Sequence, residues 1–241
     1  MQTKTKGIVL RVIPYKENQM IVHIYTLHYG RVAYIATRHR GKKSTLTKAL
    51  GIPLAVLDME VEHLPKRDLQ KVREARLAFP LTNTLCHPIK NTVALFLSEI
   101  LFRTVRETEA DERMFSYMEN ALHILNDTDL GLANFHITFL FGLSHYLGIL
   151  PHIDSYEPNA YFDMQNGCFT PAQPLHSHWL EKGESHVLRR LFRMSFENMS
   201  LYAFSRKERQ RILELILTYY RLHLPEFGDI KSWEVVCSLF E

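Results

Sequence analysis

The hydrophobic residues of this 241-residue chain change their spacing near Pro80, and this change limits the possible folds more than any other feature. Before Pro80, short segments rich in β-branched residues alternate between apolar and polar positions, which is typical of strands buried on one face. After it, apolar residues recur three and four positions apart, as on the buried face of a helix. The sequence therefore predicts an α+β protein, with a β domain over residues 1–80 and an α-helical domain over residues 81–241.

The predicted β domain has five strands, which cover residues 7–13, 20–26, 31–37, 53–62 and 69–77. Between the third and fourth strands, Ser44 is a good N-cap for a short helix, and Gly51 can end that helix. Five strands with a short helix after the third are the arrangement of an OB-fold, a barrel that binds oligonucleotides across one face and through its loops. We therefore expect an N-terminal OB-fold barrel.

The helical domain is expected to be a bundle with one irregular excursion. The excursion covers about residues 149–178, which contain four prolines and an Asn166–Gly167 turn signal inside a strand-like segment. Helix start and stop signals predict helices after Pro88, after an Asp111 cap, over 131–148, over about 179–195, over about 206–223 behind a Ser205 cap, and after Lys231.

Charge is distributed unevenly along the chain. Residues 1–80 contain 15 Lys and Arg against 6 Asp and Glu, whereas the remaining residues contain 14 against 20. No carboxylate occurs between Glu17 and Asp58. A basic β domain attracts polyanions, chiefly nucleic acid. We expect DNA phosphates to bind a set of cations in this domain: Arg31, Arg38, Arg40, Lys42, Lys43, Lys48, Lys71 and Arg73.

Other interpretations of these charges stay open. The segment 38–48 could be a merely solvated loop, and the basic group around Lys71 and Arg73 is interspersed with Asp68 and Glu74. Asp58 and Glu60 could also belong to a metal-dependent nuclease that uses the barrel only to hold its substrate. A third alternative is a scaffold whose barrel binds protein alone.

Signatures of enzymes, cofactors and membrane insertion are missing from the sequence. It has no Walker A, GxGxxG, GxSxG or HExxH motif, and its three cysteines, Cys86, Cys168 and Cys237, are far apart. It has neither a signal-peptide core nor an apolar run long enough to span a membrane. We therefore expect a cytoplasmic, non-enzymatic protein without catalytic residues, metal or cofactor.

Several segments together resemble the family of the bacterial recombination mediator RecO. The N-terminal segment has an apolar strand, a Tyr-x-Glu segment (Tyr15 and Glu17), a strand that ends at Thr26, a turn at Gly30, and a basic loop from Arg40 to Ser44. The resemblance continues through LAFPL, HITFLFGLSHYLGILP and IKSWEVVCSLF. It covers most of the chain.

The resemblance implies a role in DNA repair by homologous recombination. It implies an OB-fold and a helical domain that bind single- and double-stranded DNA, interact with single-strand-binding protein (SSB) and with RecR, and possibly with RecF. It further implies strand annealing, indirect help in loading RecA, and association with the nucleoid. Many members of the family carry a four-cysteine zinc motif, but here only Cys168 lies in the corresponding segment. Zinc is therefore not expected.

The family binds the acidic, apolar tail of SSB, which requires an apolar groove rimmed by cations. Lys90, Arg103 and Arg106, on or beside the first long helix, could supply this rim. Arg189, Arg190 and Arg193 on a later helix are the alternative.

Overall fold

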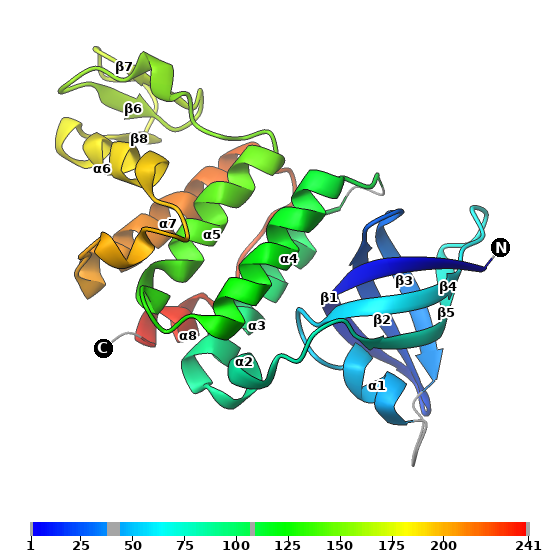
Figure 1. The fold of residues 1–241 in the computed structure, drawn as a ribbon. Coiled ribbons are helices and arrows are strands. Elements are labelled where there is room, and N and C mark those ends of the chain that lie inside the picture. Colours follow the sequence, from blue (N-terminus) through cyan, green and yellow to red (C-terminus); the bar gives the residue numbers. More distant parts are fainter. Residues whose placement is uncertain (1, 38–43, 107–108, 240–241) are drawn as a thin grey trace. The chain divides into compact units, whose positions relative to one another are not determined.

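The N-terminal part of the protein is a closed five-stranded barrel with the strand order β1-β2-β3-β5-β4 (Figure 1). The computed structural model describes residues 2–37, 44–106 and 109–239. The barrel strands are β1 (Gln2–Lys16), β2 (Gln19–Thr26), β3 (Gly30–Thr37), β4 (Val56–Glu62) and β5 (Leu69–Leu77). Helix α1 (Ser44–Leu50) lies in the chain between β3 and β4. This is the OB-fold that the sequence predicted.

The long strand β1 closes the barrel because it pairs with β2 along its C-terminal part and with β4 along its N-terminal part. Gly7 belongs to both ladders, opposite Thr26 on β2 and Leu57 on β4. A Cβ atom at this position would lie 2.5 Å from Ile24 Cγ2 and 2.8 Å from Met59 Cε. Gly7 therefore allows the barrel to close around side chains that already fill its interior.

The barrel interior is filled by apolar side chains from the strands and from α1. Val9, Val22 and Ile24 are fully buried there, and Ala49 and Leu50 of α1 pack against the same cluster. Each fully buried aliphatic side chain contributes roughly 1.5–3 kcal/mol through removal of its surface from water. Helix α1 is thus held in place by the barrel core.

The barrel forms one compact unit with several helices, which together comprise residues 1–127 and 230–239. These helices are α2 (Thr82–Cys86), α3 (Pro88–Thr104), α4 (Glu112–Asp127) and α8 (Trp233–Ser238). The predicted Asp111 cap is confirmed, since its Oδ1 accepts hydrogen bonds from the backbone N–H groups of Arg113 and Met114 at 2.8 and 3.0 Å. The Ser98 hydroxyl of α3 donates to the Leu10 carbonyl of β1 at 2.6 Å, which fixes α3 against the barrel wall.

Residues 128–229 form the second compact unit. It contains α5 (Leu132–Tyr146), α6 (Lys182–Arg193) and α7 (Arg206–His223), two short 3-10 helices, η2 (Ile153–Ser155) and η3 (Met199–Leu201), and a small sheet with the order β7-β6-β8. Its strands are β6 (Tyr161–Asp163), β7 (Cys168–Thr170) and β8 (Trp179–Leu180). The Tyr220 hydroxyl of α7 donates to the Leu140 carbonyl of α5 at 2.6 Å inside this unit.

Some predicted boundaries differ from the structure. The helix expected from about residue 179 begins at Lys182, because Trp179 and Leu180 pair with β6 as strand β8. The strand expected from residue 53 begins at Val56, because Leu54 has a positive φ of 59° that a strand residue does not adopt. The change from strands to helices lies between Leu77 and Thr82, but the first compact unit extends to Asp127. A domain boundary at residue 80 therefore stays a prediction.

Glu99 of α3 caps the start of the C-terminal segment that leads into α8. Its carboxylate accepts hydrogen bonds from the Lys231 N–H at 3.0 Å, the Ser232 N–H at 2.9 Å and the Ser232 hydroxyl at 2.7 Å. Burial alone would raise the pKa of Glu99, but these hydrogen bonds together with Arg103 lower the pKa below its ordinary value. The charged form of Glu99 is thus the one that holds α8.

We predict that Glu99→Gln destabilises the protein by about 1 kcal/mol at neutral pH, because the amide loses the charge and one acceptor oxygen. The folded protein keeps Glu99 ionised at a lower pH than the unfolded chain does. The contribution of Glu99 is therefore complete above its unfolded pKa, near 4.5, and is lost as the pH falls through the lower folded pKa. Urea unfolding at pH 7 and pH 4 measures this, with Glu109→Gln, a change at an exposed carboxylate, as the control. Equal destabilisation by Glu99→Gln at both pH values would contradict the prediction.

Candidate nucleic-acid interface

The stretch without carboxylates, between Glu17 and Asp58, contains β2, β3, α1 and the loop that joins β3 to α1. Arg38, Arg40, Lys42 and Lys43 lie outside the described residues, but both ends of their loop are described: β3 ends at Thr37, and α1 begins at Ser44. Thr37 pairs with Gln19 of β2, and Gln19 pairs with Lys16 of β1. The loop therefore leaves the barrel beside the turn between β1 and β2.

This barrel end carries further exposed groups that suit a nucleic acid. Lys16 is exposed, and its Nζ lies 5.5 Å from the ring centre of Tyr15, which is also exposed. Lys48 is exposed in the last turn of α1. Cations neutralise phosphates, and an exposed aromatic ring offers a surface on which a base can stack. Lys16 is missing from the predicted set, because only the strand register places it near Thr37, after which the basic loop begins.

Strand β5 carries two more of the predicted cations, Lys71 and Arg73. Lys71 is exposed and pairs with Ile35 of β3, and Arg73 forms an ion pair of 2.6 Å with Glu62 of β4. The side-chain hydrogen bond from Arg73 is the main reason that the pKa of Glu62 is lowered. Because this pair is exposed, it is weak and does not prevent Arg73 from exchanging partners. The DNA-binding roles of Lys48, Lys71 and Arg73 stay predictions.

A break in the β4–β5 register changes which residues of β5 share a face. The period-two pattern predicts that Lys71, Arg73 and Ala75 point to the same side of the strand. The pairing shifts between Glu60 and Val61, opposite the segment from Val72 to Glu74. Ala75 consequently packs against the barrel core, whereas Arg76 is exposed. The prediction was wrong for Ala75.

Arg31 makes contacts within the first unit that the sequence did not predict. Its Nη1 donates hydrogen bonds to the carbonyls of Phe102 and Val105 at 2.9 and 3.0 Å, and its guanidinium lies 4.3 Å from the ring centre of Phe102. These carbonyls belong to the C-terminal end of α3, where the helix leaves acceptors without partners. Burial, followed by the nearby Arg106 and Arg11, lowers the pKa of Arg31. Arg31 thus fixes α3 on the barrel, and its DNA-binding role stays a prediction.

The carboxylates of β4 lie opposite residues of β1 and β5. Asp58 of β4 lies between Lys6 of β1 and Arg76 of β5, whose Nε is 3.5 Å from Asp58 Oδ2. Glu60 lies between Lys4 and Glu74 on the same two strands. Across residues 2–37, 44–106 and 109–239, no group of three His, Cys, Asp or Glu side chains could hold a metal ion. The nuclease alternative therefore gains no support.

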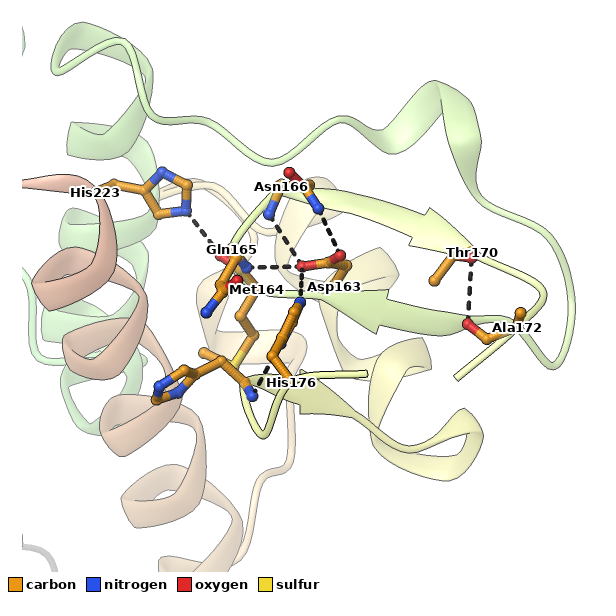
Figure 2. A network of polar contacts seen from close by, with 9 residues as sticks. Asp163, Met164, Gln165, Asn166, Thr170, Ala172, His176 and His223 are labelled. Carbon is orange, nitrogen blue, oxygen red and sulfur yellow. Dashed lines mark hydrogen bonds and ion pairs between the residues drawn. The ribbon is translucent and has the colours of Figure 1, made fainter. Parts of the chain in front are cut away.

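The small sheet of the second unit is organised around Asp163, as Figure 2 shows. Its Oδ1 accepts hydrogen bonds from the backbone N–H groups of Gln165 and Asn166 at 2.9 and 3.0 Å, and its Oδ2 accepts one from the Asn166 side chain at 2.7 Å. His176 Nε2 lies 3.1 Å from the same Oδ1. This carboxylate thus holds the predicted Asn166–Gly167 turn.

Lys90 does not lie on the surface where the rim of a peptide groove was predicted. Its side chain is only 2% exposed, and its Nζ donates to the Asn126 carbonyl at 3.0 Å. A buried ammonium group of this kind satisfies the end of α4 and is inaccessible to a partner. Lys90 was therefore wrongly assigned to the rim.

The other predicted rim cations lie nearer the surface. Arg103 is partly exposed beside Glu99 at 3.4 Å, and Arg106 is exposed. On α6, Arg189 and Arg190 lie over the rings of Tyr156 and Phe204, and Arg193 is exposed. Their roles in partner binding stay predictions.

Comparison with known proteins places this fold in a family. The family model "Recombination protein O N terminal" matches residues 1–81, and "Recombination protein O C terminal" matches residues 87–234. Relatives named DNA repair protein RecO are 40% identical over 242 residues in Bacteroides fragilis, and 37% identical over 241 residues in Azobacteroides pseudotrichonymphae. Each alignment covers 100% of both chains.

In the part of the chain that the structure describes, no helix is both long and apolar enough to cross a membrane. The five-stranded barrel, the helical region and the sequence relatives all indicate the same family. This chain belongs to the RecO family of DNA repair proteins.

Proposed function

We propose that this protein is a non-enzymatic recombination mediator that binds single- and double-stranded DNA through the basic end of its barrel. The observation that carries the proposal is the absence of any carboxylate between Glu17 and Asp58, a segment that includes the loop between β3 and α1. In this segment the cations have no local partner of opposite charge. Phosphates supply that charge and release their condensed counterions on binding.

The positive charge of the β domain is not spread evenly over the barrel. This distribution supports DNA binding at one end of the barrel more than non-specific attraction of DNA by the whole domain. The cations of β5 and β1 face the carboxylates of β4, as in the Arg73–Glu62 and Arg76–Asp58 pairs. These pairs neutralise the wall formed by β1, β4 and β5. We therefore expect the excess positive charge to act near Lys16, Lys48 and Thr37, the residue after which the basic loop begins.

The further steps belong to the same proposal. DNA held at the barrel end is brought to SSB-coated strands by binding of the acidic SSB tail, and RecR, possibly with RecF, cooperates in loading RecA. Binding of two complementary strands promotes their annealing, and these activities place the protein at the nucleoid. No step requires catalytic residues or a cofactor. Purified protein incubated with labelled DNA and Mg²⁺ or Mn²⁺ should leave the DNA uncleaved.

We predict that changing Arg40, Lys42 and Lys43 together to Ala weakens DNA binding on all sequences alike. The plot of log affinity against log salt should flatten by about 2 units for single strands and somewhat more for duplex, since each phosphate contact contributes roughly 0.7 or 0.9. Fluorescence anisotropy with labelled oligonucleotides across a salt series measures both quantities. Annealing rates should fall in parallel.

The matched control removes the same charge from the second unit, by changing Lys182, Arg193 and Lys207 to Ala. All three side chains are exposed on α6 or α7. The control should leave the salt slope unchanged. A folded loop variant with unaltered affinity and slope would exclude the loop as the DNA site, and equal losses in both variants would show that only net charge matters.

We also predict that the protein contains no stoichiometric zinc and keeps its helicity and DNA affinity in EDTA. The Asp163 carboxylate is already occupied by N–H donors, and Cys168 has no other cysteine in its segment. Elemental analysis and circular dichroism before and after chelation test this. One zinc per chain, lost together with helicity, would overturn the prediction.

A further inference from the structure

Tyr15, near the end of β1, is the one exposed side chain among the Phe, Tyr and Trp residues that the structure describes, with 49% of its surface accessible. The other tyrosines of the barrel have partners inside the protein. Tyr25 and Tyr34 are fully buried, and the ring of Tyr29 stacks on that of His63 with the ring centres 4.1 Å apart. The exposure of Tyr15 therefore requires an explanation other than packing of the barrel core.

A β-bulge sets the position of Tyr15. Pro14 pairs with Met20 of β2 and Lys16 pairs with Gln19, so the register shifts by one residue and Tyr15 has no residue opposite it. Bulges of this kind bend a strand and change the direction of a side chain, and they are frequent beside functional sites. The exposed ring is thus a consequence of how β1 pairs with β2.

A second register shift in β1 has a clear structural role, which the bulge at Tyr15 lacks. It lies between Val9 and Arg11, and its extra residue, Leu10, is 1% exposed and accepts a hydrogen bond from the Ser98 hydroxyl of α3 at 2.6 Å. In the part of the chain that the structure describes, the Tyr15 hydroxyl forms no hydrogen bond and its ring stacks on no other ring. Packing within the fold therefore does not explain the bulge at Tyr15.

A cation lies beside the exposed ring. The Nζ atom of Lys16 is 5.5 Å from the centre of the Tyr15 ring, farther than the 4.2 Å between the Arg190 guanidinium and the ring of Phe204, so the ring is only loosely covered. Within the described residues Lys16 forms no ion pair, not even with the exposed Glu17 of the same turn. A ring with a cation next to it complements a nucleotide, which has a phosphate next to a planar base.

We propose that Tyr15 stacks on an unpaired base of single-stranded DNA and gives the protein a preference for single strands over closed duplex. Lys16 binds the phosphate beside that base. In a duplex the base faces already stack on one another, so the ring gains a partner only where a base is unpaired. This inference rests on the proposed function, since it names the side chain at the basic end of the barrel that distinguishes the two forms of DNA.

The surroundings of the ring suit a base better than an apolar side chain of a protein partner. An apolar anchor requires an apolar patch around it, but residues 16–18, which follow Tyr15, are all polar and exposed. Stacking of a base requires only the ring and a nearby cation. The strand register also brings this turn near Thr37, after which the basic loop begins. A strand bound by the basic loop would therefore pass close to the ring.

The experiment compares two labelled strands of equal length in fluorescence anisotropy with the full-length protein. One strand is oligo-dT, and the other consists of abasic nucleotides, which keep the phosphates and lack the bases. The wild-type protein should bind oligo-dT at least about fivefold more tightly than the abasic strand. Tyr15→Ala should reduce this ratio to about one, and Tyr15→Leu should do the same, because Leu has an apolar side chain without a planar ring. Tyr15→Phe, which keeps the ring, should retain the ratio.

Two further measurements separate stacking from other effects. A covalently closed circular duplex offers no unpaired base, so the preference for oligo-dT over this duplex should fall in Tyr15→Ala by about the same factor. The salt slope of oligo-dT binding should stay as in the wild-type protein, because a tyrosine ring releases no counterions.

The matched control is Leu201→Ala, which removes an apolar side chain of the second unit that is 81% exposed. It should leave the ratio between oligo-dT and the abasic strand unchanged. Urea unfolding shows whether each variant is folded, and if Tyr15→Ala is not, Tyr15→Leu and Tyr15→Phe decide by the same ratio.

The outcomes distinguish this proposal from the proposed function. If the wild-type protein binds both strands equally well, or if Tyr15→Ala and Tyr15→Leu keep the base dependence, the role of Tyr15 is wrong and DNA binding through phosphates stands. If these variants lose the base dependence but the change of Arg40, Lys42 and Lys43 to Ala alters neither affinity nor salt slope, Tyr15 is a DNA contact and the basic loop is not. Absence of binding to every strand would overturn both proposals.

Discussion

Closure of the barrel by β1 is the constraint on which the first unit depends. One strand of 15 residues must pair with β4 at its start and with β2 at its end, and the two ladders overlap at Gly7, where no Cβ fits. This closure fixes the register that brings Lys16, Gln19 and Thr37 side by side. It also sets Leu10 against Ser98 of α3, so the barrel wall holds α3 through a hydrogen bond to the Leu10 carbonyl.

The Lys and Arg side chains of this unit have different structural roles. The groups that each side chain contacts determine its role. Arg31 and Lys90 donate to backbone carbonyls at helix ends, where burial makes an unpaired acceptor costly. Arg73 and Arg76 pair with carboxylates of β4 in positions open to solvent. Arg11 and Lys16 each lie near an aromatic ring. The number of positive charges in the sequence therefore overstates how many are available to an anionic ligand.

The features that the sequence predicted well are those determined by neighbouring residues. The alternation of the barrel strands, the Asp111 cap and the Ser205 capping box each depend on residues within one strand or one helical turn. The interactions of Lys90 with Asn126, and of Arg31 with Phe102, join residues 36 and 71 positions apart. No local pattern contains such contacts. The register shift between Glu60 and Val61 likewise arises from the pairing of β4 with β5. Neither strand's own sequence contains a pattern that predicts it.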